Sequence, residues 1–276
     1  MNLSHSPVRL QTQIRGEGLP LLCLHGHPGS GACMEVFSDR LSQHFKTIAP
    51  DLRGYGNSKV TGPFAMTDHL DDLEALLEQQ SVSKFAILGW SLGGILAMEL
   101  ALRHPERVQG LILVATSAYP RSNHPRTHWT DDALTGIAAL INWAAPGSAW
   151  NIELLGKRSL LRYLIQTHTP DTYRYLARYA VPAFLQTSSY ANRALGDALG
   201  SRYNRLADLG RIRCPSLVLA GDCDRHITAA SSLETAEHLP NCQAKIYQGT
   251  AHLFPWEIPE QVLADIETWL GQHISL

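Results

Sequence analysis

Short apolar runs alternate with amphipathic stretches along this chain of 276 residues, and this alternation restricts its fold more than any other feature. The apolar runs of the first half span residues 19–24, 46–49, 84–88 and 108–115. Between them, apolar residues fall at helical spacing, as Leu70, Leu73 and Leu77 do in a helix expected from about Thr67. Strands that are buried on both faces of a parallel sheet read as continuous apolar runs. The pattern therefore predicts an α/β fold with a doubly wound, mostly parallel sheet.

The strand pattern is interrupted in the middle of the chain. Residues 117–205 contain no strand-like run and show helical patterns instead, for example over residues 132–141 and 159–165. Apolar runs resume at residues 215–220 and 244–247, and a last helix is expected over residues 259–270. We therefore predict a core domain made of residues 1–116 and 206–276, with residues 117–205 inserted as a helical cap. The length of the chain and its hydrophobic content of 45% are sufficient for one large domain with such a subdomain.

The overall composition argues against several classes of protein. A formal net charge of −2 gives no indication of a nucleic-acid or membrane-surface partner. The polar N-terminus and the lack of any run of 18 apolar residues predict a soluble, cytoplasmic protein. The five cysteines follow no CxxC spacing, so we expect reduced thiols rather than disulfides or a metal site. His25 and His27 lack an acidic or cysteine partner nearby in sequence, and no GxGxxG follows the first strand, so no metal and no nucleotide cofactor is expected.

One serine stands among glycines where a predicted strand meets a predicted helix. The stretch GWSLGG, residues 89–94, follows the apolar run of residues 84–88 and precedes a helix expected over residues 92–104. A G-x-S-x-G pattern in this context is typical of a sharp turn that raises a nucleophilic serine above the sheet. The alternative is a tight turn without a catalytic role. We predict that Ser91 is a nucleophile.

Three further polar segments follow predicted strands and are expected at the same edge of the sheet. They are HGHPGSG, GDCDRHI and GTAHLFPW, at residues 25–31, 221–227 and 249–256. A serine hydroxyl needs a base beside it, and the base needs a carboxylate that orients it. His252 provides the base, and Asp222 or Asp224 provides the carboxylate. His226 is a rival base, although it lies only two residues beyond Asp224.

The chain resembles the α/β-hydrolase superfamily along essentially its whole length. The motifs that carry the resemblance are HGHPG, DLRGYGNS, GWSLGG, GDCDRHI and AHLFPWE. The superfamily usually places its acid last in a G-x-x-D stretch, which favours Asp224 over Asp222. The resemblance also implies an oxyanion hole made by the backbone N–H groups of His27 and Leu92. With serine rather than aspartate at the turn, it implies hydrolysis of a small or medium carboxylic ester or thioester through an acyl-enzyme.

The residues around the serine extend the resemblance to a substrate class. LGWSLGG, with Trp90 before the serine, is similar to the turn of methyl esterases that release pimeloyl from an acyl carrier protein, and these esterases dock the acidic carrier on arginines of the cap. We expect Trp90 and His226 to contact the substrate. Proline iminopeptidases share HG-x-PG and DxRG-x-G-x-S but carry G-G-S-W-G at the turn. C–C bond hydrolases and cofactor-free perhydrolases use the same triad, and a binding protein with a vestigial triad is a further alternative.

The predicted cap differs in charge from the rest of the chain. Residues 117–205 carry a net charge of +5, whereas the remainder of the chain carries −7. Two arginine pairs, Arg158 with Arg162 and Arg174 with Arg178, have the i, i+4 spacing of neighbours on one helix face. The alternative is an ordinary solvated face. The cap arginines are therefore candidates for docking an acidic carrier.

Two loops are expected to be braced by polar side chains without a catalytic role. His25, in the HGHPG stretch, is predicted to brace its own loop rather than act as a base. Asp51 and Arg53, in the DLRGYGNS stretch, are predicted to brace theirs as a pair.

Overall fold

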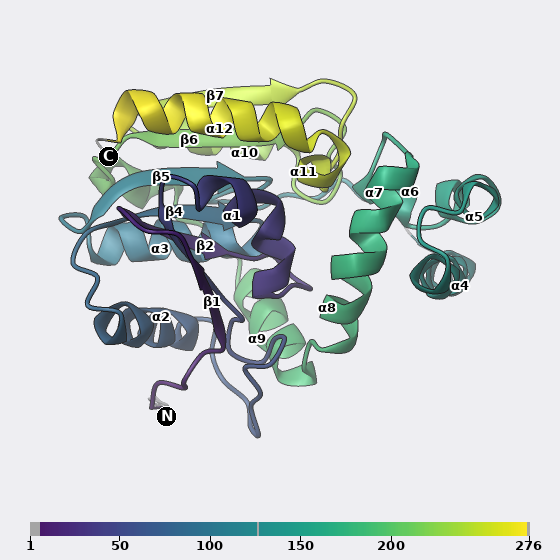
Figure 1. Ribbon diagram of the computed structural model, residues 1–276, viewed down its shortest axis with the longest axis horizontal. Helices are drawn as coiled ribbons and strands as arrows, with labels where there is room; N and C mark the ends of the chain where they lie inside the picture. The colour runs from purple at the N-terminus through teal and green to yellow at the C-terminus, as the bar shows by residue number, and fades with distance from the viewer. Residues whose placement is uncertain (1–5, 126, 275–276) are drawn as a thin grey trace.

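The computed structural model describes residues 6–125 and 127–274. Its centre is a seven-stranded sheet with the order β1-β3-β2-β4-β5-β6-β7, in which only β1 runs antiparallel to its neighbour (Figure 1). The strands are β1 (Thr12–Arg15), β2 (Pro20–Leu24), β3 (Lys46–Pro50), β4 (Phe85–Trp90), β5 (Val108–Val114), β6 (Ser216–Gly221) and β7 (Cys242–Tyr247). The prediction of a doubly wound, mostly parallel sheet is confirmed.

Strand β1 is absent from the sequence-based prediction. Its four residues, TQIR, are mostly polar, and they pair with the outer edge of β3 from Thr12 opposite Pro50 to Arg15 opposite Thr47. An edge strand of this kind contributes little apolar surface to the core, so it lacks the continuous apolar run that identifies the inner strands.

Helices cover both faces of the sheet because successive side chains of the inner strands point to opposite sides. In β4, Ala86 and Leu88 face one apolar cluster, whereas Phe85 and Ile87 face the other. The first cluster includes residues of α1 (Glu35–Leu41) and α12 (Pro259–His273). The second includes residues of α2 (Asp68–Gln79), α3 (Leu92–Arg103) and α10 (Ala229–His238) or its C-cap. Shorter elements of the core are η1 (Gly31–Met34), η4 (Leu206–Arg211) and α11 (Phe254–Glu257).

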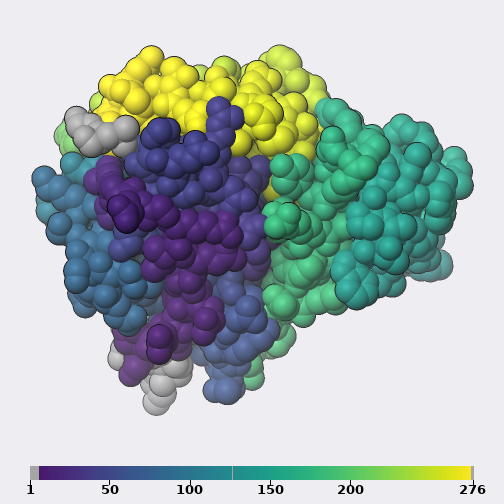
Figure 2. Space-filling model, in the orientation of Figure 1, coloured from purple at the N-terminus to yellow at the C-terminus, as the bar shows by residue number. Residues whose placement is uncertain are grey.

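A group of helices lies beside the sheet, mostly at the right of Figure 1 with α9 at the lower centre, and is teal to green in Figure 2. Its elements are α4 (Trp129–Ala144), α5 (Ala149–Leu154), η2 (Gly156–Arg158), α6 (Leu161–Leu164), α7 (Pro170–Tyr175), η3 (Leu176–Ala180), α8 (Val181–Leu185) and α9 (Ser189–Gly200). These helices fall within residues 117–205, where no strand occurs in the described parts of the chain. The boundaries of the cap at residues 117 and 205 stay a prediction. No helix in the described ranges is both long and apolar enough to span a bilayer.

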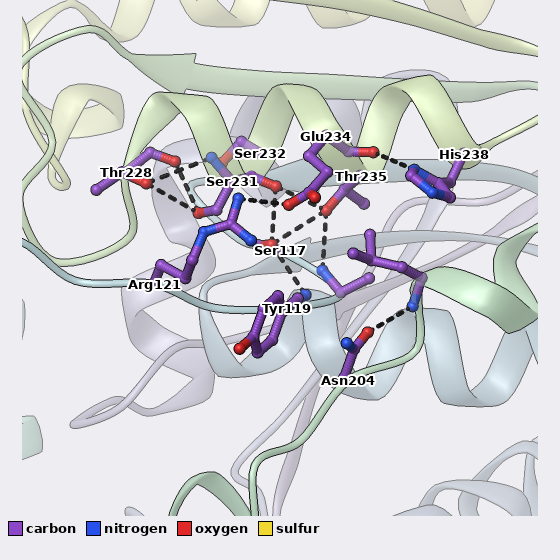
Figure 3. A network of polar contacts seen from close by, with 12 residues as sticks. Ser117, Tyr119, Arg121, Asn204, Thr228, Ser231, Ser232, Glu234, Thr235 and His238 are labelled. Carbon is purple, nitrogen blue, oxygen red and sulfur yellow. Dashed lines mark hydrogen bonds and ion pairs between the residues drawn. The ribbon is translucent and has the colours of Figure 1, made fainter.

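Hydrogen bonds fix the point where the chain enters the cap. The Ser117 hydroxyl donates to the Ser231 carbonyl at 2.8 Å, and the backbone N–H of Ala118 donates to the Thr235 hydroxyl at 2.9 Å (Figure 3). The returning segment lies beside this point, because the Arg205 N–H donates to the Ala118 carbonyl at 2.9 Å. Both connections of the cap are thus held at one place, against helix α10.

Candidate active site

Ser91 occupies a sharp turn between β4 and α3. Its backbone has φ 54° and ψ −114°, a conformation that residues other than glycine rarely adopt. The neighbouring glycines permit this turn: a Cβ on Gly93 would lie 2.0 Å from the Leu24 carbonyl oxygen, and one on Gly89 would lie 2.4 Å from the Gly93 carbonyl oxygen. The close approach of these backbones explains why the sequence places glycines here. The turn has the geometry that G-x-S-x-G predicts.

His252 and Asp224 meet beside this turn. The Nδ1 atom of His252 lies 2.8 Å from Oδ2 of Asp224, and both side chains are buried. The second oxygen of Asp224 accepts the backbone N–H groups of His226 and Ile227. Asp222 instead accepts the N–H groups of the 249–250 turn. Of the two carboxylates left open by the sequence, Asp224 is therefore the one that contacts the imidazole.

Ser91 and His252 line one pocket of about 560 Å³. Three other predicted site residues also line it: Trp90, His27 and His226. Its cap side is formed mostly by apolar side chains, among them Leu140, Leu160, Leu161, Leu164, Phe184 and Leu185. The Ser91 hydroxyl makes no hydrogen bond with the described residues; nucleophile–base bonds often form only in the substrate complex. A second hollow, of about 870 Å³, lies between α2, α3 and α9 and contains none of the predicted site residues.

The predicted oxyanion donors lie on two sides of Ser91. Leu92 is the first residue of α3, so its N–H belongs to the helix N-terminus that follows the serine. On the other side, a Cβ on Gly26 would lie only 3.1 Å from the Ser91 Cβ, which places the loop of Gly26 and His27 against the serine. The imidazole of His27 is held by the Tyr55 hydroxyl, 2.8 Å from its Nδ1. The contribution of His27 at this site is therefore expected from its backbone.

Comparison with known proteins decides the family. The family model described as alpha/beta hydrolase fold matches residues 20–259. The chain belongs to the α/β-hydrolase fold family. A pimeloyl-[acyl-carrier protein] methyl ester esterase of Aliivibrio fischeri is 42% identical over 96% of this chain and 98% of its own length.

More distant relatives agree with this placement. An esterase of the same description from Aeromonas hydrophila is 26% identical over 93% of this chain and 97% of its own length. Among solved structures, a thermophilic esterase from Thermogutta terrifontis is similar with a TM-score of 0.71 and 26% identity, covering 96% of this chain and 94% of that one. The predictions of an α/β-hydrolase fold and of ester hydrolysis are confirmed at this level. The roles of the individual site residues stay predictions.

His226 lies against the candidate base of this α/β hydrolase. Its ring meets that of His252 edge-on, with the centroids 4.7 Å apart, and its Nδ1 lies 3.3 Å from Nε2 of His124. Burial lowers the pKa of His226 to about 3, and the neighbouring His252 contributes to this lowering. The Asp224 carboxylate contacts the His226 backbone and the His252 ring. The arrangement therefore favours His252 over His226 as the base.

His25 braces the loop that passes Ser91, as predicted. Its Nε2 accepts the Leu52 N–H at 3.0 Å, so its Nδ1 carries the proton and donates to the Gly26 carbonyl at 2.7 Å.

The prediction that Asp51 and Arg53 form a pair is wrong. Asp51 accepts the backbone N–H groups of residues 31 and 57, whereas Arg53 binds Asp72 at 2.5 Å. Two carboxylates of α2 thus neutralise the guanidinium in place of Asp51: Asp72, and Asp68 at 3.7 Å.

Burial of His25 predicts a loss of stability in mild acid. Burial lowers its pKa to about 4, whereas an unfolded histidine titrates near 6.5. Below pH 6.5 the unfolded chain binds the proton first, so stability falls between about pH 6.5 and 4, by roughly 2 to 3 kcal/mol for this group. Urea unfolding at pH 7.5 and 4.5 measures the effect. We expect His25→Asn to show a smaller difference between the two pH values; an unchanged difference would contradict the assignment.

Proposed function

We propose that this α/β hydrolase cleaves the methyl ester of an acyl group carried on an acyl carrier protein. The observation that carries this proposal is its 42% identity, over 96% of the chain, to an esterase described as acting on pimeloyl-[acyl-carrier protein] methyl ester. The apolar lining of the pocket suits a methylene chain, because each buried CH₂ contributes about 0.8 kcal/mol. The charge of the cap suits an acidic carrier.

The proposed mechanism assigns one role to each candidate site residue. Ser91 attacks the ester carbonyl while Nε2 of His252 takes the hydroxyl proton, and Asp224 holds the imidazole through Nδ1. The N–H groups of His27 and Leu92 stabilise the negative charge on the carbonyl oxygen. Collapse of this intermediate releases methanol, which takes the proton from His252. Water then attacks the acyl-enzyme with His252 as base. The bond between the acyl carbon and the Ser91 oxygen breaks, His252 returns the proton to that oxygen, and the acid leaves.

The cap arginines differ in how free they are to bind a carrier. Arg158 ends η2 and Arg162 lies in α6, so the prediction that they share one helix face is wrong. Arg162 binds Asp131 at 2.9 Å and also donates to backbone carbonyls. Arg174 and Arg178 likewise form ion pairs with carboxylates. Arg158 is exposed and forms no ion pair with the described residues, so it is the best placed of the four to meet an acidic partner.

The carrier proposal predicts a substrate-dependent effect of Arg158→Glu. At low salt, this variant is expected to lower kcat/KM for a carrier-linked methyl ester by roughly 3- to 10-fold, because a charge at the rim of an interface acts mainly on association. Hydrolysis of p-nitrophenyl butyrate should be unchanged, and the difference should shrink at high salt. Mass spectrometry of the carrier measures the loss of the methyl group.

Arg193→Glu is the matched control, because Arg193 is exposed on α9 and forms no ion pair with the described part of the chain. Equal effects of the two variants, or equal effects on both substrates, would exclude docking at Arg158. Absence of turnover of the carrier-linked ester by the unmodified enzyme, with p-nitrophenyl butyrate hydrolysed, would refute the proposed substrate.

A further inference from the structure

Glu257 joins the loop of the candidate base to the cap. It is the last residue of α11, and its buried carboxylate accepts three backbone N–H groups. One oxygen accepts from Ala251 at 2.9 Å. The other accepts from Gln166 at 2.8 Å and from Thr167 at 2.6 Å. A single side chain therefore bonds to the residue before His252 and to two residues of the cap.

The residue after His252 is fastened to the same part of the cap. The backbone N–H of Leu253 donates to the Leu164 carbonyl at 2.9 Å. Trp256, the residue before Glu257, packs edge-on against Trp90 and stacks on Tyr175 of the cap. The ring centroids are 5.0 Å and 6.3 Å from that of Trp256, respectively. Leu253 is thus bonded directly to the cap at Leu164, and Ala251 is linked to Gln166 and Thr167 through the Glu257 carboxylate. The two residues that flank His252 are therefore both connected to residues 164–167.

Only a carboxylate can satisfy this arrangement. Glu257 forms no ion pair with a described cation, so its charge is stabilised by the three N–H donors alone. Hydrogen bonds to a charged acceptor are about twice as strong as neutral ones. A glutamine has one acceptor oxygen and would turn its NH₂ group toward either the cap donors or the Ala251 donor. Replacement by glutamine therefore breaks one side of the link while preserving the shape of the side chain.

We propose that Glu257 is a positioning residue that couples residues 164–167 of the cap to the His252 loop. The base is aligned with Ser91 only while this cap segment is in place. Since α6 leads directly into the segment, a carrier docked beside α6 contacts the same unit that holds the base. This inference rests on the proposed role of His252 as the base and assigns Glu257 no contact with substrate.

Glu257→Gln is expected to lower kcat for p-nitrophenyl butyrate by roughly 10- to 100-fold with KM changed less than about twofold. The reason is that misplacement of a catalytic group by about 1 Å costs on the order of 100-fold in rate. Rates are taken per folded molecule, with the folded fraction measured by circular dichroism. The matched control is Glu260→Gln, whose exposed carboxylate bonds to the half-exposed Arg40 at 3.0 Å. The control should retain the rate of the unmodified enzyme.

A spectroscopic measurement separates positioning from general destabilisation. The Nδ1 proton between His252 and Asp224, whose atoms are 2.8 Å apart, should give a low-field proton resonance. We expect this resonance to shift or broaden in Glu257→Gln and to persist in Glu260→Gln. Retention of full kcat by Glu257→Gln would overturn the proposal. So would a loss of rate per folded molecule with the resonance unchanged.

Hydrogen exchange in the unmodified enzyme tests the link without any variant. If one carboxylate holds the amides of Ala251, Gln166 and Thr167, the three should open as a unit and show a common protection. Exchange of the two cap amides independently of Ala251 would overturn the proposal. The kinetic, resonance and exchange measurements need no carrier-linked substrate. Failure to hydrolyse the carrier-linked ester would therefore refute the proposed function without affecting the test of Glu257.

Discussion

Ser91→Ala is expected to lower the hydrolysis of p-nitrophenyl butyrate by roughly four powers of ten or more while leaving the fold intact. Without the hydroxyl no acyl-enzyme forms, and only the oxyanion donors and substrate binding remain to accelerate the reaction. Alanine keeps a Cβ at the position with φ 54°, so the strain of the turn is the same in both proteins. Stability should therefore change little.

Two measurements check this expectation. Steady-state kinetics gives the loss of rate, and a fluorophosphonate should label the unmodified enzyme on the peptide that contains Ser91 but not label the variant. Retention of turnover within tenfold of the unmodified enzyme, at equal melting temperature, would show that Ser91 is not the nucleophile.

Asp224→Asn is the second substitution with a large expected effect. An asparagine at this position can hold the imidazole in the wrong tautomer, and the corresponding change in a serine protease costs about 10⁴ in kcat. In this chain the carboxylate contacts Nδ1 of His252 at 2.8 Å, and the Asp224 side chain is fully buried. We expect a loss of roughly three to four powers of ten in kcat.

Asp222→Asn provides a matched control two residues away. Asp222 is exposed and accepts the backbone N–H of Gly249 at 2.8 Å, which an asparagine oxygen can also accept. Its kcat should stay within about threefold of the unmodified enzyme. The reverse result, with Asp222→Asn inactive and Asp224→Asn active, would contradict the assignment of the acid.

The sequence predicts the elements of this site because their signals are local in the chain. The glycines around Ser91 stand in six consecutive letters, although the close contact of Gly93 is with Leu24 of the neighbouring strand β2. The parallel strands carry continuous apolar runs, and their polar ends gather at one edge for reasons of topology alone. The order of serine, acid and histidine then follows from the chain.

What sequence reasoning misses depends on contacts between distant segments. The partner of Arg53 is Asp72, nineteen residues on, although Asp51 is closer in the chain. Arg158 and Arg162 are separated by the break between η2 and α6, which their spacing does not reveal. Glu257 stands in the AHLFPWE motif, but its bonds reach the cap some 90 residues away. The motif indicates that Glu257 lies near the candidate base, but it does not identify the cap residues to which Glu257 bonds.

The side-by-side connections of the cap have a consequence for engineering. Because the chain leaves and re-enters the core where Arg205 bonds to Ala118, a foreign segment whose ends lie equally close could be spliced in without altering the sheet. Such a chimera would inherit the turn of Ser91 unchanged. The inserted segment would also have to offer two backbone N–H groups to the Glu257 carboxylate, as Gln166 and Thr167 do. Only segments that meet this requirement would be suitable replacements.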